Sequence, residues 1–553
     1  MKIMLQHFNN PLFKDMLQLQ KNEKGQESKY MSLTSTYFII FMLILVPVYY
    51  LVPKKIQWFV LLAASLVFYA FGGLFNIFYV LFTSLTVYCG TRFMDKLNNK
   101  QKEYLKANKE NLSRDEKKAY KAKIKSKRKT VMLCSILLNL AVLVFFKFLY
   151  PFNSLLSYFG KDALSIIMPL GISYYTLQAI GYAVDVYWGN AECEKNYLKV
   201  LLFVSFFPQV TQGPISDFKQ LSNELFTEHE FTYKNYSWGF QRLIWGFFKK
   251  MVIANLMLPY VKNLFENYAS YSGLTLFIGI FVVMVQLYAD FSGYMDIVCG
   301  VCEMLGIKLS ENFNGPFFSK SLSEFWRRWH ITLGAWFKKY VFFTVGTSRL
   351  ANSISGKVKN KFGADAGEKT VSTVALLAIW FSIGIWHSVN LPFVLWGLLN
   401  GVIMIISVWL EPVYTSVKSK LHINDKAKPW KLFQMARTFT LVSALEVFSD
   451  AGTLKDGTGY LVQIFKSALG IPKSFAQLFP YVENRLNFGY LFIGLVFILA
   501  FSIVGRQKTV RVYFNKIPII VRILILSVVF FLIIIIGVPI IIENGGGFLY
   551  EQF

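Results

Sequence analysis

The chain has 553 residues, of which 54% are hydrophobic and 16% charged, and its mean hydropathy is +0.43. Soluble domains carry about 25% charged residues, so this composition excludes an ordinary soluble multidomain protein and indicates a polytopic membrane protein. The formal net charge is +26, and the basic residues lie between apolar segments, as they do in cytoplasmic loops that face anionic headgroups. We therefore expect the lipid bilayer as the partner of this charge, and no nucleic acid.

The apolar segments predict an all-α polytopic fold with about eleven to thirteen transmembrane helices. Residues 1–35 form a polar N-terminal segment without the apolar stretch of a cleavable signal peptide, so we expect the first helix to direct insertion. Residues 36–90 carry the N-terminal transmembrane helices, with apolar runs at Tyr37–Val52, Trp58–Tyr69 and Phe75–Cys89.

Residues 91–130 mark the sharpest change of composition in the chain. From Arg92 to Lys129 there are fifteen Lys or Arg residues against five Asp or Glu. Their pattern is typical of solvated helices, and the positive-inside rule places such a segment in the cytoplasm. We therefore expect a basic cytoplasmic helical loop or hairpin here.

Residues 131–410 form the core of the predicted bundle, and residues 411–553 add C-terminal transmembrane helices. The apolar segments of the core are Val131–Leu149, Ile166–Tyr187, Tyr197–Val210, Trp238–Leu258, Leu274–Val301, Thr370–His387 and Pro392–Leu410. Those of the C-terminal part are Phe433–Phe448, Phe488–Val504 and Ile517–Ile542. Residues 449–487 are the least hydrophobic there and predict an interfacial or extracellular subregion.

Three of the core segments depart from the pattern of a simple lipid-facing helix. Pro208 and Pro214 predict a broken or re-entrant element at the end of Tyr197–Val210. Leu274–Val301 contains Asp290 and Asp296, which are six residues apart and so do not share a helix face, with a bend expected at Gly293. The segment Ile166–Tyr187 is expected to line a bundle interior or cavity, because it carries the polar residues Ser173, Tyr174, Thr176, Gln178 and Asp185.

The stretch Ser321–Tyr340 reads S-L-S-E-F-W-R-R-W-H-I-T-L-G-A-W-F-K-K-Y and is too polar and short to span a membrane cleanly. Ser321 and Glu324 form a capping box that predicts a helix start, and Glu324 with Arg328 is an i,i+4 pair. We expect a re-entrant or interfacial helix. Such a helix would group Trp326, His330, Leu333 and Phe337 on one face, and Phe325, Trp329, Thr332 and Trp336 on another.

Two of the five histidines, His330 and His387, are flanked by tryptophans and enclosed by apolar sequence. The others, His7, His229 and His422, lie in polar segments and are expected at the surface. No metal site is expected, because no H-x-x-x-H pattern occurs and Cys299-x-x-Cys302 has no second cysteine pair. We interpret these cysteines as small helix-packing residues. A structural role and a general-base role remain the alternatives for the two histidines.

A neutral imidazole in a low-dielectric pocket is suited to take a proton from a hydroxyl during acyl transfer. No G-x-S-x-G elbow occurs, so the hydroxyl can belong to the acceptor. His387 lies in the more apolar setting, where Ser388 and Asn390 offer hydrogen bonds that orient the ring, and is the better predicted proton acceptor. His330 follows Arg327 and Arg328, which disfavour its charged form and can hold a phosphate or carboxylate, so it is the better donor-site or orienting group.

Five sequence blocks recur in an order that resembles one family. They are P-L-G-I-S-Y-Y-T-L-Q at Pro169–Gln178, F-F-P-Q-V-T-Q-G-P-I at Phe206–Ile215, Q-L-Y-A-D-F-S-G-Y-M-D at Gln286–Asp296, E-F-W-R-R-W-H-I-T-L-G-A-W at Glu324–Trp336 and W-H-S-V-N-L-P-F-V-L-W-G at Trp386–Gly397. Together, over about residues 165–400, they resemble the membrane-bound O-acyltransferase (MBOAT) family, and most closely its branch of alginate O-acetylation proteins.

The resemblance implies a ring or funnel of transmembrane helices with re-entrant or interfacial helices, and it makes residues 131–410 the catalytic core. It also implies acyl transfer to a hydroxyl, with His387 as the catalytic histidine of the W-H block and His330 as that of the R-W-H block. The groups expected to bind or orient donor and substrate are Trp326, Trp329, Arg327, Arg328, Glu324, Ser388, Asn390, Asp290 and Gln178. The chain departs from the family pattern at Lys338–Lys339, where Arg-Asp is usual, at Ser388, where glycine is usual, and at Phe448–Ser449, where Phe-Arg is usual.

These features predict a multi-pass plasma-membrane O-acyltransferase that acetylates an extracytoplasmic cell-surface or secreted polysaccharide. No bound cofactor is expected. The acyl donor is a thioester, acetyl-CoA in our hypothesis, and the acceptor is the glycan or an extracytoplasmic partner protein. Two alternatives remain: D-alanyl transfer to teichoic acid from a carrier-protein thioester, and a polysaccharide or lipid transporter without acyl chemistry. A transporter would account for the intramembrane aspartates but not for the two histidines, and the sequence has no inverted repeat.

Overall fold

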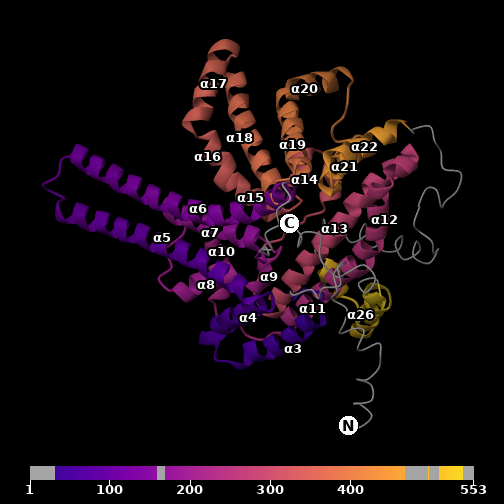
Figure 1. Cartoon of the computed structure of the whole chain (residues 1–553), viewed down its shortest axis with the longest axis horizontal. Coiled ribbons are helices and arrows are strands. Elements are labelled where there is room, and N and C mark those ends of the chain that lie inside the picture. Colours follow the sequence, from indigo (N-terminus) through magenta and orange to yellow (C-terminus); the bar gives the residue numbers. More distant parts are fainter. Residues whose placement is uncertain (1–30, 159–168, 467–495, 497–509, 540–553) are drawn as a thin grey trace, which may run out of the picture. The chain divides into compact units, whose positions relative to one another are not determined.

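The computed structural model describes residues 31–158, 169–466, 496 and 510–539, which are helices joined by short connections (Figure 1). The chain divides into two compact units. The N-terminal unit holds the described residues of 31–239 and 301–310, and the C-terminal unit holds those of 240–300 and 311–539. Within the described ranges the only β-pairing is an isolated antiparallel bridge between Phe313 and Trp329, so the all-α prediction is confirmed.

The N-terminal unit is built from helices that follow the predicted apolar segments. Its elements are α3 (Thr36–Leu51), η1 (Lys54–Ile56), α4 (Gln57–Phe71), α5 (Leu74–Ala107), α6 (Arg114–Tyr158), α7 (Ile172–Trp188), α8 (Tyr197–Ser205), α9 (Phe207–Val210) and α10 (Phe218–Leu225).

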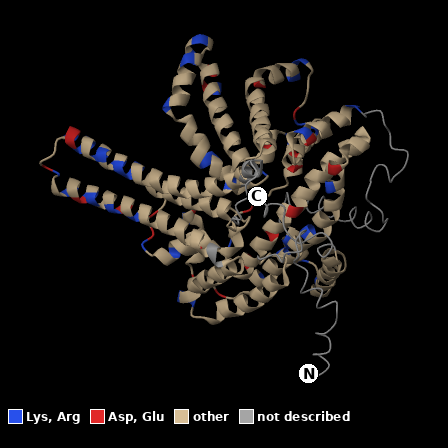
Figure 2. Cartoon of the chain, in the orientation of Figure 1, with Lys and Arg blue, Asp and Glu red and all other residues tan. Residues whose placement is uncertain are grey.

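The basic segment is an antiparallel helical hairpin, as the sequence predicts. Helix α5 continues through Ala107 and α6 begins at Arg114 (Figure 1). The rings of Tyr104 and Tyr120 pack with centroids 4.2 Å apart near the turn. Blue ribbon segments, which mark Lys and Arg, recur along both helices toward that turn in Figure 2. The charge therefore lies on ordered helices that continue beyond their apolar halves.

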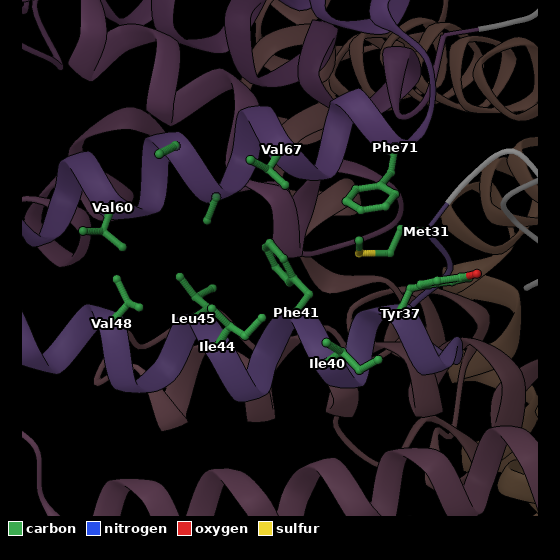
Figure 3. A pocket seen from close by; sticks show the side chains of 12 residues that line it. Met31, Tyr37, Ile40, Phe41, Ile44, Leu45, Val48, Val60, Val67 and Phe71 are labelled. Carbon is green, nitrogen blue, oxygen red and sulfur yellow. The ribbon is translucent and has the colours of Figure 1, made fainter. Parts of the chain in front are cut away.

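A groove of about 390 Å³ lies between α3 and α4. Figure 3 shows side chains of the two helices pointing toward one another across it, with Phe41 between them. None of its lining residues is charged; they are Met31, Tyr37, Ile40, Phe41, Ile44, Leu45, Val48, Val60, Ala63, Ala64, Val67 and Phe71. The groove contains none of the histidines that the sequence singles out.

Two predictions about the middle of the N-terminal unit are confirmed. Every residue of α7 from Ile172 to Val186 is buried, in agreement with an interior helix. The helix that follows is broken, because α8 ends at Ser205 and the short α9 ends at Val210. Pro208 lies in the first turn of α9, where its missing N–H leaves no helix hydrogen bond unmade.

The C-terminal unit contains the longest of the five sequence blocks, Glu324–Trp336. Its first helix, α11, begins in the N-terminal unit. The elements are α11 (Tyr233–Phe247), η2 (Phe248–Ala254), α12 (Asn255–Glu266), η3 (Tyr268–Ser270), α13 (Gly273–Met304), η4 (Pro316–Phe318), α14 (Leu322–Trp326), α15 (Ile331–Phe337), η5 (Lys338–Phe342), α16 (Phe343–Gly346), α17 (Arg349–Phe362), α18 (Ala364–His387), α19 (Leu391–Trp409), α20 (Glu411–Lys420), α21 (Lys428–Asp450), α22 (Leu454–Lys466), α25 (Val510–Phe514), α26 (Ile519–Leu532) and η6 (Ile533–Gly537).

Helix α13 runs without interruption from Gly273 to Met304, so Gly293 does not break the helix, and the bend there stays a prediction. The glycine instead allows close packing, because a Cβ there would lie 3.0 Å from the Gly246 carbonyl oxygen of α11. The close approach brings Asp296 within 2.7 Å of the Lys249 ammonium and 2.9 Å of the Arg242 guanidinium.

Asp290 forms a separate ion pair with Lys250, and both side chains are buried. The two aspartates therefore contact different cations, as their six-residue spacing predicts. We call Arg242, Lys249, Lys250, Asp290 and Asp296 the ion-pair ladder.

Seven helices of the described chain are long and apolar enough to cross a membrane: Lys54–Phe71, Asn76–Ala107, Arg114–Leu149, Gly273–Met304, Ala364–His387, Leu391–Trp409 and Ile519–Gly537. The protein is therefore a multi-pass membrane protein. The larger predicted number also counted segments that fold as shorter helices, such as α7 and α8. It further counted Phe488–Val504, of which the structure describes only residue 496. Residues 467–487, which follow α22, also lie outside the described residues.

Candidate active site

The stretch Ser321–Tyr340 does not form the single helix that its sequence pattern predicts. Helix α14 begins as expected, with the Ser321 hydroxyl accepting a hydrogen bond from the Glu324 backbone N–H at 3.1 Å. It ends at Trp326, and a second helix, α15, begins only at Ile331. The predicted shared face of Trp326 and His330 is therefore wrong.

The break is caused by a neighbouring extended segment that pairs with residues 328–331. The Asn314 N–H donates to the Arg328 carbonyl at 3.0 Å, and the Ile331 N–H donates to the Asn312 carbonyl at 3.1 Å. His330, between them, adopts a left-handed conformation with φ 47° and ψ 51°. This conformation costs an L-residue with a side chain roughly 1–2 kcal/mol, so surrounding contacts must hold it.

The His330 ring is buried at 4% exposure. It packs edge-on against Phe291 of α13, with centroids 4.8 Å apart, and lies 6.3 Å from Trp386 of α18. Neither ring nitrogen has a hydrogen-bond partner among the described residues. Burial lowers the pKa of His330 to about 3, because an imidazolium would lose its hydration there. The ring is therefore neutral at physiological pH, with both nitrogens available.

This shifted pKa predicts a pH-dependent stability. The unfolded histidine takes up a proton below about pH 6.5, whereas folded His330 does not until about pH 3. The unfolded state binds more protons between these values, so stability falls on acidification by up to about 1.4 kcal/mol per pH unit. Thermal unfolding of wild type and His330→Asn in detergent at pH 7, 6 and 5 measures this loss. The variant should lose less stability than wild type, and equal losses would contradict the buried neutral ring.

His387 is the last residue of α18 and is also buried, at 6% exposure. Its ring centroid lies 4.8 Å from Trp386, 5.4 Å from Trp396 and 6.0 Å from Phe393. The last two residues belong to α19, which packs tightly on α18. A Cβ at Gly397 would lie only 2.5 Å from the Trp380 carbonyl oxygen. This crossing brings α19 aromatics onto the ring.

The two histidines therefore meet at one side chain, since both rings lie against Trp386. Around them, Trp326, Trp380 and Trp396 contact one another with centroids 5.0 to 6.0 Å apart. Their indole N–H groups are satisfied: that of Trp326 donates to Asn400 Oδ1, that of Trp380 to Met404 Sδ and that of Trp396 to Glu446 Oε2. The result is an aromatic wall beside Trp386, which both imidazoles contact.

The arginines expected beside His330 are engaged elsewhere. Arg328 donates to the Glu324 carboxylate at 2.8 Å, which confirms the predicted i,i+4 pair, and to the Asn314 carbonyl. Arg327 is exposed and donates to the Ser323 hydroxyl at 2.9 Å. The lowered pKa of His330 comes from burial, so the predicted influence of the arginines on it is wrong.

The remaining predicted site residues differ in their burial and in their contacts. Ser388 accepts a hydrogen bond from the Asn390 backbone N–H at 3.2 Å, and Asn390 is exposed at the start of α19. Trp329 is buried and stacks on Phe325, with centroids 5.5 Å apart. Asp290 belongs to the ion-pair ladder. Gln178 is buried in α7 of the N-terminal unit, where its Nε2 has no hydrogen-bond partner among the described residues.

The other histidines differ in part from the predicted surface positions. His422 is exposed, as predicted. His229 is half-buried, and its Nδ1 lies 3.0 Å from the Tyr49 hydroxyl, so the surface prediction is wrong there. The Gln57 amide explains this placement, since it donates to the His229 carbonyl and accepts from its N–H. His7 lies outside the described residues. In the described part of the chain, no three His, Cys, Asp or Glu side chains are grouped as metal ligands would be.

Sequence reasoning missed several residues that shape the site. Phe291 packs against the His330 ring, and Asn312 accepts from the Thr332 N–H two residues later. Trp380, Trp396 and Glu446 build the wall beside His387. A signal existed for Trp396, which lies in the same block as His387, and for Phe291, which follows Asp290 in another block. Asn312 and Glu446 gave no signal, because their roles depend on contacts with distant segments.

Comparisons with known proteins identify relatives of this chain. Residues 194–359 match the model of the membrane-bound O-acyltransferase family, MBOAT. The chain is 30% identical over 318 residues to the Probable alginate O-acetylase AlgI of Pseudomonas syringae pv. tomato, covering 56% of each protein. It is 28% identical to the peptidoglycan O-acetyltransferase of Helicobacter pylori, over 62% of this chain and 64% of that protein. It is also 28% identical to the teichoic acid D-alanyltransferase of Bacillus subtilis, over 43% and 59%. The chain thus spans less than two thirds of each of these relatives.

Proposed function

We propose that this chain, which belongs to the membrane-bound O-acyltransferase family, transfers acetyl groups to hydroxyls of an extracytoplasmic polysaccharide at the cell membrane. Two of the relatives described above are named for O-acetylation, one of alginate and one of peptidoglycan. Both polymers lie outside the cytoplasm, which supports an acceptor of that class. The larger share of this chain that they cover favours acetyl over D-alanyl transfer.

The observation that carries the proposal is the pair of buried histidines whose rings both lie against Trp386. Acyl transfer to a hydroxyl needs a base that is neutral at working pH and close to the reacting oxygen. His330 is neutral because it is buried, and its ring nitrogens have no partner among the described residues. An aromatic wall excludes water, which protects a thioester from hydrolysis.

In the proposed reaction, His387 takes the proton of the acceptor hydroxyl as its oxygen attacks the carbonyl carbon of an acyl thioester. The new C–O bond forms, the C–S bond breaks, and the sulfur leaves with the proton that the imidazole returns. The products are an ester and a free thiol. His330 donates its ring N–H to the oxygen of the same hydroxyl and orients it. At the end of the cycle each histidine has the same protonation state as at the start.

The donor and acceptor follow from the chemistry of this step. A thioester can transfer its acyl group to a hydroxyl without further activation. We therefore propose acetyl-CoA as the donor. The acceptor hydroxyl belongs either to the glycan or to an extracytoplasmic partner protein that completes the transfer. The second candidate function, D-alanyl transfer to teichoic acid, is supported by the relative of that name.

Analysis of the surface polymer tests this function. Cells that lack the protein, and the same cells expressing it, are treated with mild alkali, and the released acetate and D-alanine are quantified against total polymer. We expect ester-linked acetate only in the expressing cells. Release of D-alanine in its place would support the second candidate. A change in the amount of surface polymer without any change in acylation would contradict acyl transfer and support transport.

A further inference from the structure

We propose that Asn312 is a positioning residue for His330, and that it holds the left-handed turn that presents this imidazole. The inference rests on the proposed function, because it concerns a histidine that the proposed acyl transfer uses. Asn312 lies in the extended segment before η4, outside every block that resembles the family, and is buried at 1% exposure.

Asn312 supplies the N-terminal cap of α15 from a distant part of the chain. Its side-chain Oδ1 accepts hydrogen bonds from the Thr332 backbone N–H at 2.9 Å and from the Thr332 hydroxyl at 2.7 Å. Its backbone carbonyl accepts from the Ile331 N–H at 3.1 Å. The first N–H groups of a helix have no partner within the helix, and the side chain of His330, at the N-cap position, provides none here. Because Asn312 caps the helix, the His330 imidazole has no capping role.

The same side chain also ties the turn to the helix that supports the ring. The Asn312 Nδ2 group donates to the Met295 sulfur of α13 at 3.0 Å. Met295 lies four residues after Phe291, so both are on one side of α13, and Phe291 packs against the His330 ring. One amide thus links the backbone after His330 to the element that the ring contacts.

The sequence itself explains why such a restraint is needed. The helical pattern from Leu322 to Phe337 favours one continuous helix, in which His330 would adopt a right-handed conformation beside Trp326. The observed break replaces that alternative. Without the Asn312 acceptors, the Ile331 and Thr332 N–H groups lose their partners, and a continuous helix would satisfy them with carbonyls of the preceding turn. The ring of His330 would then leave its place between Phe291 and Trp386.

Steady-state kinetics of the purified full chain in detergent test this role, with acetyl-CoA as the probe donor, a soluble polysaccharide as the probe hydroxyl acceptor and free thiol as the readout. Asn312→Leu removes the acceptor at similar volume, Thr332→Val removes only the hydroxyl, and Thr332→Ser keeps it. We expect kcat of Asn312→Leu to fall about 10–100-fold, as displaced catalytic groups do, with KM for acetyl-CoA little changed. Thr332→Val should fall less, and Thr332→Ser should retain activity.

A second buried asparagine gives the matched control. Asn139 of α6 is also 1% exposed and bonded, to the Thr86 hydroxyl at 3.0 Å and the Ser135 carbonyl at 2.8 Å. Asn139→Leu should lower thermal stability but keep kcat per folded molecule. Deuterium exchange of the peptide covering residues 328–337 should become faster in Asn312→Leu and not in Asn139→Leu. Ester-linked acetate on the surface polymer, at equal protein abundance, repeats the comparison in cells.

Two results overturn the inference. The first is a wild-type kcat for folded Asn312→Leu. The second is an equal loss of kcat in Asn139→Leu, which would mean that any buried asparagine is needed for general stability. The variant His330→Asn, measured in the same assays, distinguishes a failure of the proposed function from a failure of the role proposed for Asn312. Full activity of that variant removes the histidine from the reaction, whereas an inactive His330→Asn beside an active Asn312→Leu refutes only the role of Asn312.

Discussion

Replacing either buried histidine should nearly abolish acyl transfer. His387→Ala and His330→Asn are each expected to lower ester-linked acetate on the surface polymer, and turnover of acetyl-CoA, by about 10²–10⁴-fold, the usual contribution of a general acid–base group. The reason is geometric, because both rings contact Trp386 and no other described histidine lies there. Asparagine is chosen at position 330 because it tolerates the left-handed backbone.

The control for this experiment is His422→Ala. His422 is exposed in a loop and also has a positive φ of 50°, so it matches His330 in backbone but not in burial. Its activity should equal that of wild type. Membrane abundance and thermal stability of all three variants must be measured alongside. If both active-site variants keep full acylation at equal abundance, the catalytic assignment fails.

Breaking the ion-pair ladder should have the largest effect on stability. Asp290→Leu removes the carboxylate that pairs with Lys250, whose side chain is only 2% exposed. Removing one partner of a buried ion pair typically costs about 3–5 kcal/mol, because the remaining charge is uncompensated, and a whole domain is stable by about 5–15 kcal/mol. We expect a sharp fall in the yield of monodisperse protein after detergent extraction, measured by size-exclusion chromatography.

The double variant Lys250→Met/Asp290→Leu separates charge from packing. It removes both charges and keeps apolar volume, so it should recover most of the lost yield. Asp365→Ala serves as the surface control, since Asp365 pairs with Lys369 at 2.7 Å but its side chain is 79% exposed. Such pairs contribute about 0–1 kcal/mol, and this variant should extract like wild type. A double variant that extracts no better than Asp290→Leu would mean that the ladder has a role other than charge compensation.

The fold was predictable wherever a local pattern determines it. The apolar runs, the basic hairpin and the break after Ser205 all follow from residues that are close in sequence. The break at His330 does not, because the local pattern favours a continuous helix and the extended segment at Asn312 overrides it from eighteen residues away. The same reason hid the role of Gly293, whose neighbour Gly246 lies on another helix.

The candidate site was predictable in its histidines but not in its surroundings. His330 and His387 were recognisable because histidine between tryptophans is unusual in apolar sequence. Their relation through Trp386, and the bonding of Arg328 to Glu324 rather than toward His330, depend on side-chain directions that sequence spacing does not give. The assignment of roles to the two histidines stays a prediction that the variants above decide.

The basic hairpin formed by α5 and α6 affects how any kinetic measurement on this protein should be read. Between Arg92 and Lys129 it carries fifteen basic residues against five acidic ones, on helices that continue beyond their apolar halves. Such a field attracts polyanions at low ionic strength and is screened within about 8 Å at physiological salt. An anionic donor should therefore show an apparent KM that rises with salt even though the buried His330 imidazole is neutral. Variants can be compared only at one fixed salt concentration, and the salt slope itself reports on the hairpin rather than on the chemistry.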